Sequence, residues 1–96
     1  MALRDDYNFE YLVNEAERLV IDELERVLES QEEPVCMCQD CVLDMAAMAL
    51  NRVRAMYRVS LLGKLYADAP SPDYAESISA AVRTAVSKIR NNPSHD

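Results

Sequence analysis

Apolar residues between positions 5 and 30 recur at the i, i+3, i+4, i+7 spacing of one buried helical stripe. They are Phe9, Leu12, Val13, Ala16, Leu19, Val20, Val27 and Leu28, with Ile21 and Leu24 between them. Acidic residues fill most of the remaining positions, as on a solvated face. The pattern predicts a long amphipathic helix from about Asp5 to Ser30, and its surplus apolar length favours packing against a second chain.

A second apolar stretch runs from about Asp40 to Arg54 and is apolar nearly all round. This predicts a central helix that is covered on most sides. Among its few polar residues, Asp44 and Asn51 are seven apart and so share one face. Tyr57 to Ser60 is consistent with a short extended piece.

The last predicted helix begins after a proline-rich linker. Either Ser71 caps it with Pro72 in the first helical position, or Asp73 caps it with Glu76 reaching back. Its apolar stripe consists of Ala75, Ile78, Val82, Ala85, Val86 and Ile89, and Asn91-Asn92-Pro93 ends it.

Composition fits one small helical domain over residues 1–96. The chain is 50% apolar and has a single glycine, Gly63. Tight β-hairpins need Gly or Asn-Gly turns, so a sandwich or barrel is disfavoured. We therefore expect an all-α domain of three to four helices: a long N-terminal helix, a central apolar helix and a C-terminal amphipathic helix.

The net charge of −7 is unevenly distributed. Residues 1–33 carry −8 and residues 34–96 carry +1, so duplex nucleic acid is an unsuitable partner while a small anionic ligand suits the second half. The chain contains no apolar run of about 18 residues and no N-terminal signal-peptide pattern, so we expect a cytosolic protein away from membranes.

Three cysteines lie within six residues, as Cys36-x-Cys38-x-x-Cys41 before the central helix. Three thiolates this close can reach one soft divalent ion, and zinc is the default for sulfur ligands in the cytosol. Candidates for a fourth ligand are His95, Asp40, Asp44 or a group from a partner chain. Inert buried thiols and redox-active thiols are the alternatives.

A basic run begins at the end of the predicted central helix and contains no acidic residue between Arg52 and Lys64. It consists of Arg52, Arg54, Arg58 and Lys64, with Tyr57 and Tyr66 interleaved. Arginine pairs with phosphate and with the guanine O6/N7 edge, while a carboxylate or amide such as Asp44 or Asn51 can accept the guanine N1 and N2 hydrogens. The set suits a guanine nucleotide, but the three arginines could equally pair with the acidic first helix. With no Gly-rich phosphate loop, Ser/His/Asp set or HExxH motif, we expect no enzymatic activity.

The segment CMCQDCVLDMAAMALNR, residues 36–52, resembles the signature of the ComFB family of late competence development proteins. That signature is a CxCxxC segment, then an Asp, then an Ala-Leu-Asn run, and Tyr57, Gly63, Tyr66 and Asn92-Pro93-x-His95 match further positions. The family usually has Leu-Pro-Pro where this chain has Val53-Arg54-Ala55-Met56. Without those prolines, we expect the central helix to run a turn further towards Tyr57.

The resemblance implies an all-helical homodimer that binds zinc and the second messenger cyclic di-GMP. It also implies a small receptor tied to competence, motility or cell-size control. The implied metal ligands are Cys36, Cys38 and Cys41, to which we add His95. The expected nucleotide-binding residues are Asp44, Asn51, Arg52, Arg54, Tyr57, Arg58 and Lys64. The alternative is a zinc-stabilised dimeric interaction module that binds no nucleotide, and a thiol redox or zinc-sensing switch is a third possibility.

Overall fold

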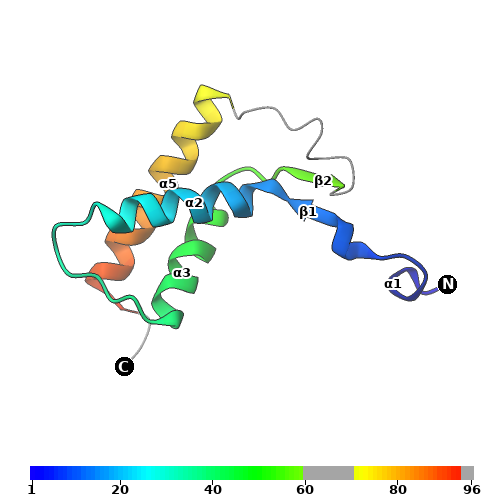
Figure 1. The fold of residues 1–96 in the computed structure, drawn as a ribbon, viewed down its shortest axis with the longest axis horizontal. Helices are drawn as coiled ribbons and strands as arrows, with labels where there is room; N and C mark the ends of the chain where they lie inside the picture. Colours follow the sequence, from blue (N-terminus) through cyan, green and yellow to red (C-terminus); the bar gives the residue numbers. More distant parts are fainter. Residues whose placement is uncertain (60–70, 94–96) are drawn as a thin grey trace.

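The computed structural model describes residues 1–59 and 71–93. The elements are α1 (Leu3–Asp6), η1 (Phe9–Tyr11), β1 (Leu12–Asn14), α2 (Glu15–Glu29), α3 (Gln39–Leu50), β2 (Tyr57–Val59) and α5 (Pro72–Asn91). Three helices, α2, α3 and α5, form the body of the fold. A two-stranded antiparallel sheet joins this body to an N-terminal arm, residues 1–11 (Figure 1).

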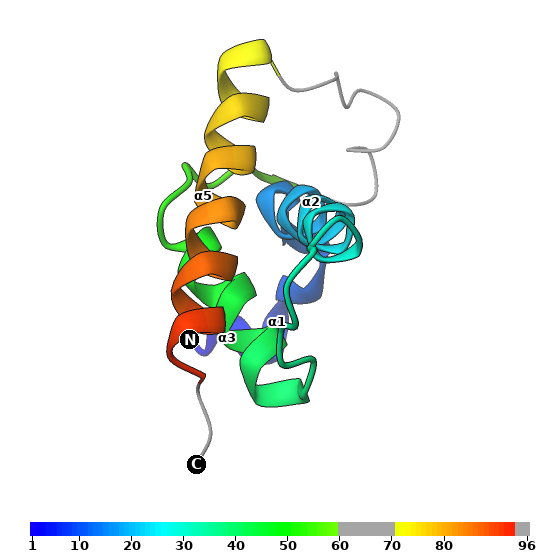
Figure 2. The same cartoon turned by 90° about the vertical axis from the view of Figure 1, so that its left-hand side faces the viewer.

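The core lies where α5 packs against both α2 and α3 (Figure 2). Its fully buried side chains come from all three helices and include Val20, Met45, Val82 and Val86. Apolar burial of this kind is the main favourable term in folding. The amphipathic stripe of α5 is buried as predicted, except that Ala75 is exposed and Tyr74 is buried in its place.

The prediction of one helix from Asp5 to Ser30 is wrong over its first ten residues. The helix begins only at Glu15, because the Asn14 side chain caps it, accepting a hydrogen bond from the backbone N–H of Ala16 at 3.1 Å. The same oxygen accepts the backbone N–H of Met56 at 2.8 Å, which holds β2 against β1. The fold is therefore mostly helical with a small sheet, rather than all-α. Phe9 and Leu12, which were predicted to lie on the buried stripe, are 49% and 50% exposed.

The central helix is shorter than predicted. It ends at Leu50, with Asn51 as its C-cap, so the expectation that it continues to Arg54 or towards Tyr57 is wrong. The physical reason is that the Met56 carbonyl accepts the backbone N–H of Glu15 at 2.7 Å, which requires an extended chain before β2. One face of α3 is also open in the single chain, since Leu43 is 57% exposed.

Two local predictions are confirmed. Tyr57 to Val59 form a strand, in register with Asn14 to Leu12. Ser71 caps α5 by accepting the backbone N–H of Tyr74 at 3.2 Å, with Pro72 in the first helical position. Among the helices described, none is long and apolar enough to cross a bilayer.

Candidate functional site

The cysteine segment assembles at the start of α3, as the spacing predicted. The Sγ atoms of Cys36, Cys38 and Cys41 all lie within 4.8 Å of one another. Cys38 is the N-cap of α3, and its Sγ accepts the backbone N–H of Cys41 at 3.4 Å. Cys41 is fully buried in the core, whereas Cys36 is half-buried and Cys38 is exposed.

This arrangement fits a metal ion. Zinc–sulfur bonds of about 2.3 Å in a tetrahedral site place sulfur atoms about 3.8 Å apart, and the three sulfur atoms here all lie within 4.8 Å of one another. The three cysteines can therefore hold a metal ion with little movement. Asp40 and Asp44 lie on the first two turns of α3, and His95 lies outside the described residues.

The loop that precedes the cysteines is tied to the end of α5. The Arg90 Nη1 donates to the Gln31 Oε1 at 3.1 Å, and the Arg90 Nε lies 3.7 Å from the Glu33 Oε2. These contacts join segments 57 to 59 residues apart, so the end of α5 helps to position the loop that leads to the cysteine segment.

Arg52 and Arg54 lie on the loop after α3, beside the first turn of α5. With Ser71, Asp73 and Tyr74 they line a hollow of about 410 Å³. The Arg54 guanidinium lies 5.3 Å from the centre of the Tyr74 ring, and the Tyr74 hydroxyl donates to the Arg54 carbonyl. Burial raises the pKa of Tyr74, and the positive charge of Arg54 only partly opposes this.

Arg58 lies apart from that hollow, inside the joint between β2 and α2. Its Nε donates to the Glu15 Oε2 at 2.9 Å, and Arg18 donates to the other carboxylate oxygen at 2.6 Å. Burial acts to raise the pKa of Glu15, but hydrogen bonds and charges from Arg18 and Arg58 outweigh it and lower the pKa below its ordinary value. The sequence left two roles open for Arg58, nucleotide binding and pairing with an acidic residue of the first helix. In the structure Arg58 is paired with Glu15.

The remaining predicted nucleotide-binding residues do not line the hollow of Arg52 and Arg54. Asp44 and Met48 line a separate hollow of about 510 Å³ with Lys88 at the far end of α5. Because α3 and α5 run antiparallel, Asp44 and the Arg52–Arg54 pair are near opposite ends of α5. Asn51 and Tyr57 are exposed, and Lys64 lies outside the described residues. A single chain therefore does not gather the described members of this set into one hollow.

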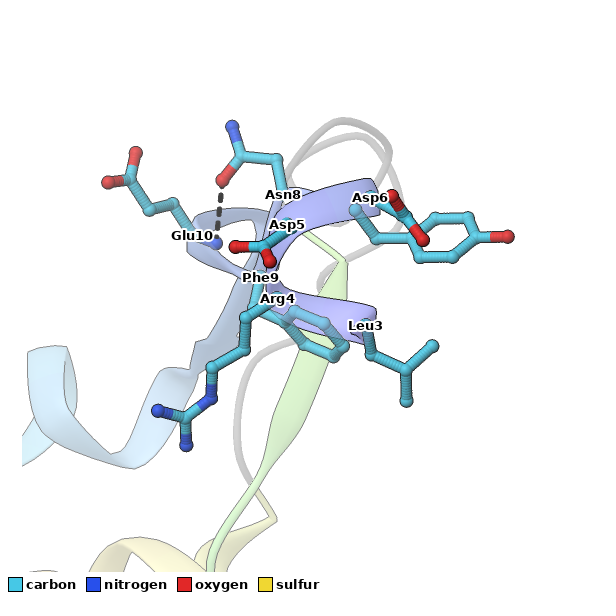
Figure 3. Close-up of a pocket in the computed structure, with 8 residues that line it drawn as sticks. Leu3, Arg4, Asp5, Asp6, Asn8, Phe9 and Glu10 are labelled. Carbon is cyan, nitrogen blue, oxygen red and sulfur yellow. Dashed lines mark hydrogen bonds between the residues drawn. The ribbon is translucent and has the colours of Figure 1, made fainter. Parts of the chain in front are cut away.

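Sequence reasoning missed the central role of Glu15, which it placed on the solvated face. A signal was present, since Glu15 lies three residues after Leu12 and four before Leu19 and so falls on the apolar stripe. It also missed a hollow of about 850 Å³ on the arm, lined by Leu3 to Glu10. Figure 3 shows this segment, with the Asn8 side chain accepting the Glu10 backbone N–H at 3.0 Å.

Comparison with known proteins gives one family. The family model described as late competence development protein ComFB matches residues 13–93. The match begins within β1 and ends just after α5. It therefore covers the three-helix body and nearly all of the sheet, and it leaves out the N-terminal arm. Neither the curated proteins nor the solved structures contain a match to the chain.

Proposed function

The chain belongs to the ComFB family of late competence development proteins, and on that premise we propose that it is a cytosolic, homodimeric receptor for cyclic di-GMP. The receptor passes its signal on through protein contacts, in regulation of the competence or motility type, without catalysing a reaction. The signature segment, residues 36–52, and Tyr57 lie within the residues that the family model matches.

The observation that carries the proposal is the hollow formed by Arg52, Arg54 and the first turn of α5. The start of α5 contributes the partial positive charge of a helix N-terminus, which favours a phosphate, although Pro72 has no N–H and the Tyr74 N–H is already bonded to Ser71. Two guanidinium groups beside it can pair bidentately with phosphate oxygens. Asp73 lies in the same hollow, where a carboxylate can accept the N1 and N2 hydrogens of guanine.

A homodimer supplies what one chain does not bring together. Asp44, Asn51 and Tyr57 are exposed and none of them lines the arginine hollow, so a second copy of the chain is a way to bring such residues to the ligand. The open face of α3, where Leu43 and Ala47 are exposed, is apolar and suits a second copy. In this proposal, Tyr57 stacks on a guanine base and Lys64 meets phosphate.

The cysteine segment supports a structural zinc ion in the same protein. Cys36, Cys38 and Cys41 would hold the ion, and the fourth ligand would come from His95, Asp40, Asp44 or the partner chain. When bound, the ion would fix the loop between α2 and α3 to the first turn of α3, since Cys36 precedes that helix and Cys41 lies within it.

A zinc-stabilised dimeric interaction module without a nucleotide is the alternative function. It is favoured by one observation: the three sulfur atoms lie within 4.8 Å of one another, while the described residues predicted to bind the nucleotide line different hollows or none. In that case Arg52 and Arg54 would affect dimerisation or stability but no ligand response.

Thermal unfolding with and without nucleotide tests the proposal. A ligand at one hundred times its dissociation constant adds about 2.7 kcal/mol of stability. We expect cyclic di-GMP to raise the Tm of the wild type and of Arg83→Ala, an exposed arginine on α5, but not of Arg52→Ala/Arg54→Ala. An equal shift in all three proteins would contradict the assignment of these two arginines. No shift in the folded wild type at high-micromolar nucleotide would contradict the receptor function.

A further inference from the structure

An apolar groove lies between α2 and the cysteine segment, away from the arginine hollow. Ile21, Leu24 and Leu28 line it from α2, while Met37 and Val42 line it from the other side. Its volume is about 470 Å³. Ile21 is 54% exposed and Met37 is 62% exposed, so the groove opens to solvent over two of its largest side chains.

Two carboxylates border this apolar surface. Glu25 and Glu29 lie one turn apart on α2 and complete the lining of the groove. The basic residues of α2 do not neutralise them, because Arg18 is hydrogen-bonded to Glu15 and Asp22, and Arg26 to Glu23. The groove is therefore apolar at its floor and negatively charged at its edge.

We propose that this groove binds a basic amphipathic helix of a partner protein. The residues on α2 lie at i, i+3, i+4, i+7 and i+8, which spans about two helical turns. A partner helix lying along them would insert apolar side chains at the same spacing and place Lys or Arg against Glu25 and Glu29. This is the helix-in-groove mode of recognition, and an unbranched methionine such as Met37 adapts its shape to the inserted side chains.

Charge argues against a second copy of the chain as the occupant. In a two-fold dimer built on this groove the same patch meets itself, and the described residues of its lining hold two carboxylates but no basic side chain that could pair with those of the other copy. The exposed apolar arm is equally unsuitable, because its Arg4 is outnumbered by Asp5, Asp6 and Glu10. A basic amphipathic helix matches both parts of the groove, because its apolar side chains fit the apolar floor and its cations can pair with Glu25 and Glu29.

Binding of a designed peptide tests the proposal without any nucleotide. The probe is a fluorescent peptide of about 18 residues, long enough to form a helix, with leucines at i, i+3, i+4 and i+7 and lysines elsewhere. We expect saturable binding to the wild type that weakens at least about tenfold in Glu25→Lys/Glu29→Lys. Ile21→Ser should weaken it about fivefold, since the peptide then buries less apolar surface.

Matched controls separate the groove from general attraction to an acidic protein. Asp6→Lys/Glu10→Lys changes the net charge by the same amount on the arm, and it should alter the peptide affinity less than about threefold. The proposal is overturned if this control loses as much affinity as the groove variant, or if a peptide with glutamate for lysine binds equally well. It is also overturned if Ile21→Ser dissociates a dimer of the chain in sedimentation, because a second copy would then fill the groove.

Discussion

The two ends of α3 carry the two candidate chemistries, and they differ in how far the single chain has assembled them. At the N-terminal end, three sulfur atoms are within 4.8 Å of one another. Beyond the C-terminal end, the arginines separate, since Arg58 is hydrogen-bonded to Glu15 while Arg52 and Arg54 lie beside α5. The three cysteines are close in sequence, so forming the cap of α3 is enough to bring them together. The positions of the arginines on the loop after α3 depend instead on tertiary packing.

Removing the metal should produce the largest effect. We expect about one zinc ion per purified chain, and Cys38→Ser/Cys41→Ser should lose it together with several kcal/mol of stability, because a structural zinc site contributes folding energy. Elemental analysis and chemical denaturation measure the two effects. Met37→Leu, in the same segment but without a ligand atom, should retain the metal. A wild type with far less than one zinc per chain would contradict the assignment of the cysteine cluster as a zinc site.

Replacing Glu15 should produce the next largest effect, because it holds Arg58 in place. Glu15→Gln leaves a half-buried guanidinium without its charge partner, which should cost about 1–3 kcal/mol in denaturant unfolding at pH 7. Glu17→Gln, on an exposed neighbour, should change stability by less than about 0.5 kcal/mol. Equal costs in the two variants would show that the Arg58 pair contributes nothing.

The same glutamate makes stability depend on acidity. Its folded-state pKa is lowered from 4.5, so the stabilisation from ionised Glu15 is fully present above about pH 4.5. It falls as pH drops through the lower folded-state pKa, because the proton binds the unfolded chain more tightly. Denaturation from pH 7 to pH 3 should show a shallower acid decline in Glu15→Gln than in the wild type, and parallel declines would contradict this role.

Asn14→Ala tests the joint between the sheet and α2. The substitution removes the N-cap of α2 and the acceptor for the Met56 backbone N–H, and it should cost about 1–2 kcal/mol. Asn8→Ala, which removes the cap of the short η1 on the arm, is the matched control and should have little effect. If both variants melt alike, the capping argument for where α2 begins is wrong.

The smallest stability effect should come from Arg54→Ala. Its carbonyl still accepts the Tyr74 hydroxyl, so only the cation–π contact is lost, at about 0.5–1 kcal/mol. A larger loss of stability would mean that Arg54, like Arg58, serves the fold rather than a ligand. Chemical denaturation of the variant beside Arg83→Ala decides this.

Local chemistry in the sequence was sufficient to predict the cysteine cluster and the strand at Tyr57–Val59, and it limited the cap of α5 to Ser71 or Asp73. It was not sufficient to predict that Leu12–Asn14 forms the partner strand, because apolar spacing there also fits a helix and the pairing spans more than 40 residues. The separation of Asp44 from Arg52 and Arg54 could not be predicted either. It depends on the antiparallel packing of α3 against α5, which no short motif encodes.

Isothermal titration calorimetry with cyclic di-GMP tests the central claim most directly. Zinc-replete wild-type protein should give saturable heat, and Arg52→Ala/Arg54→Ala should bind at least about tenfold more weakly, as expected for the loss of two charge-assisted phosphate contacts. Absence of heat up to high-micromolar nucleotide, with the protein folded and its zinc in place, would contradict the receptor function. That result would leave the zinc-stabilised interaction module as the function of this chain.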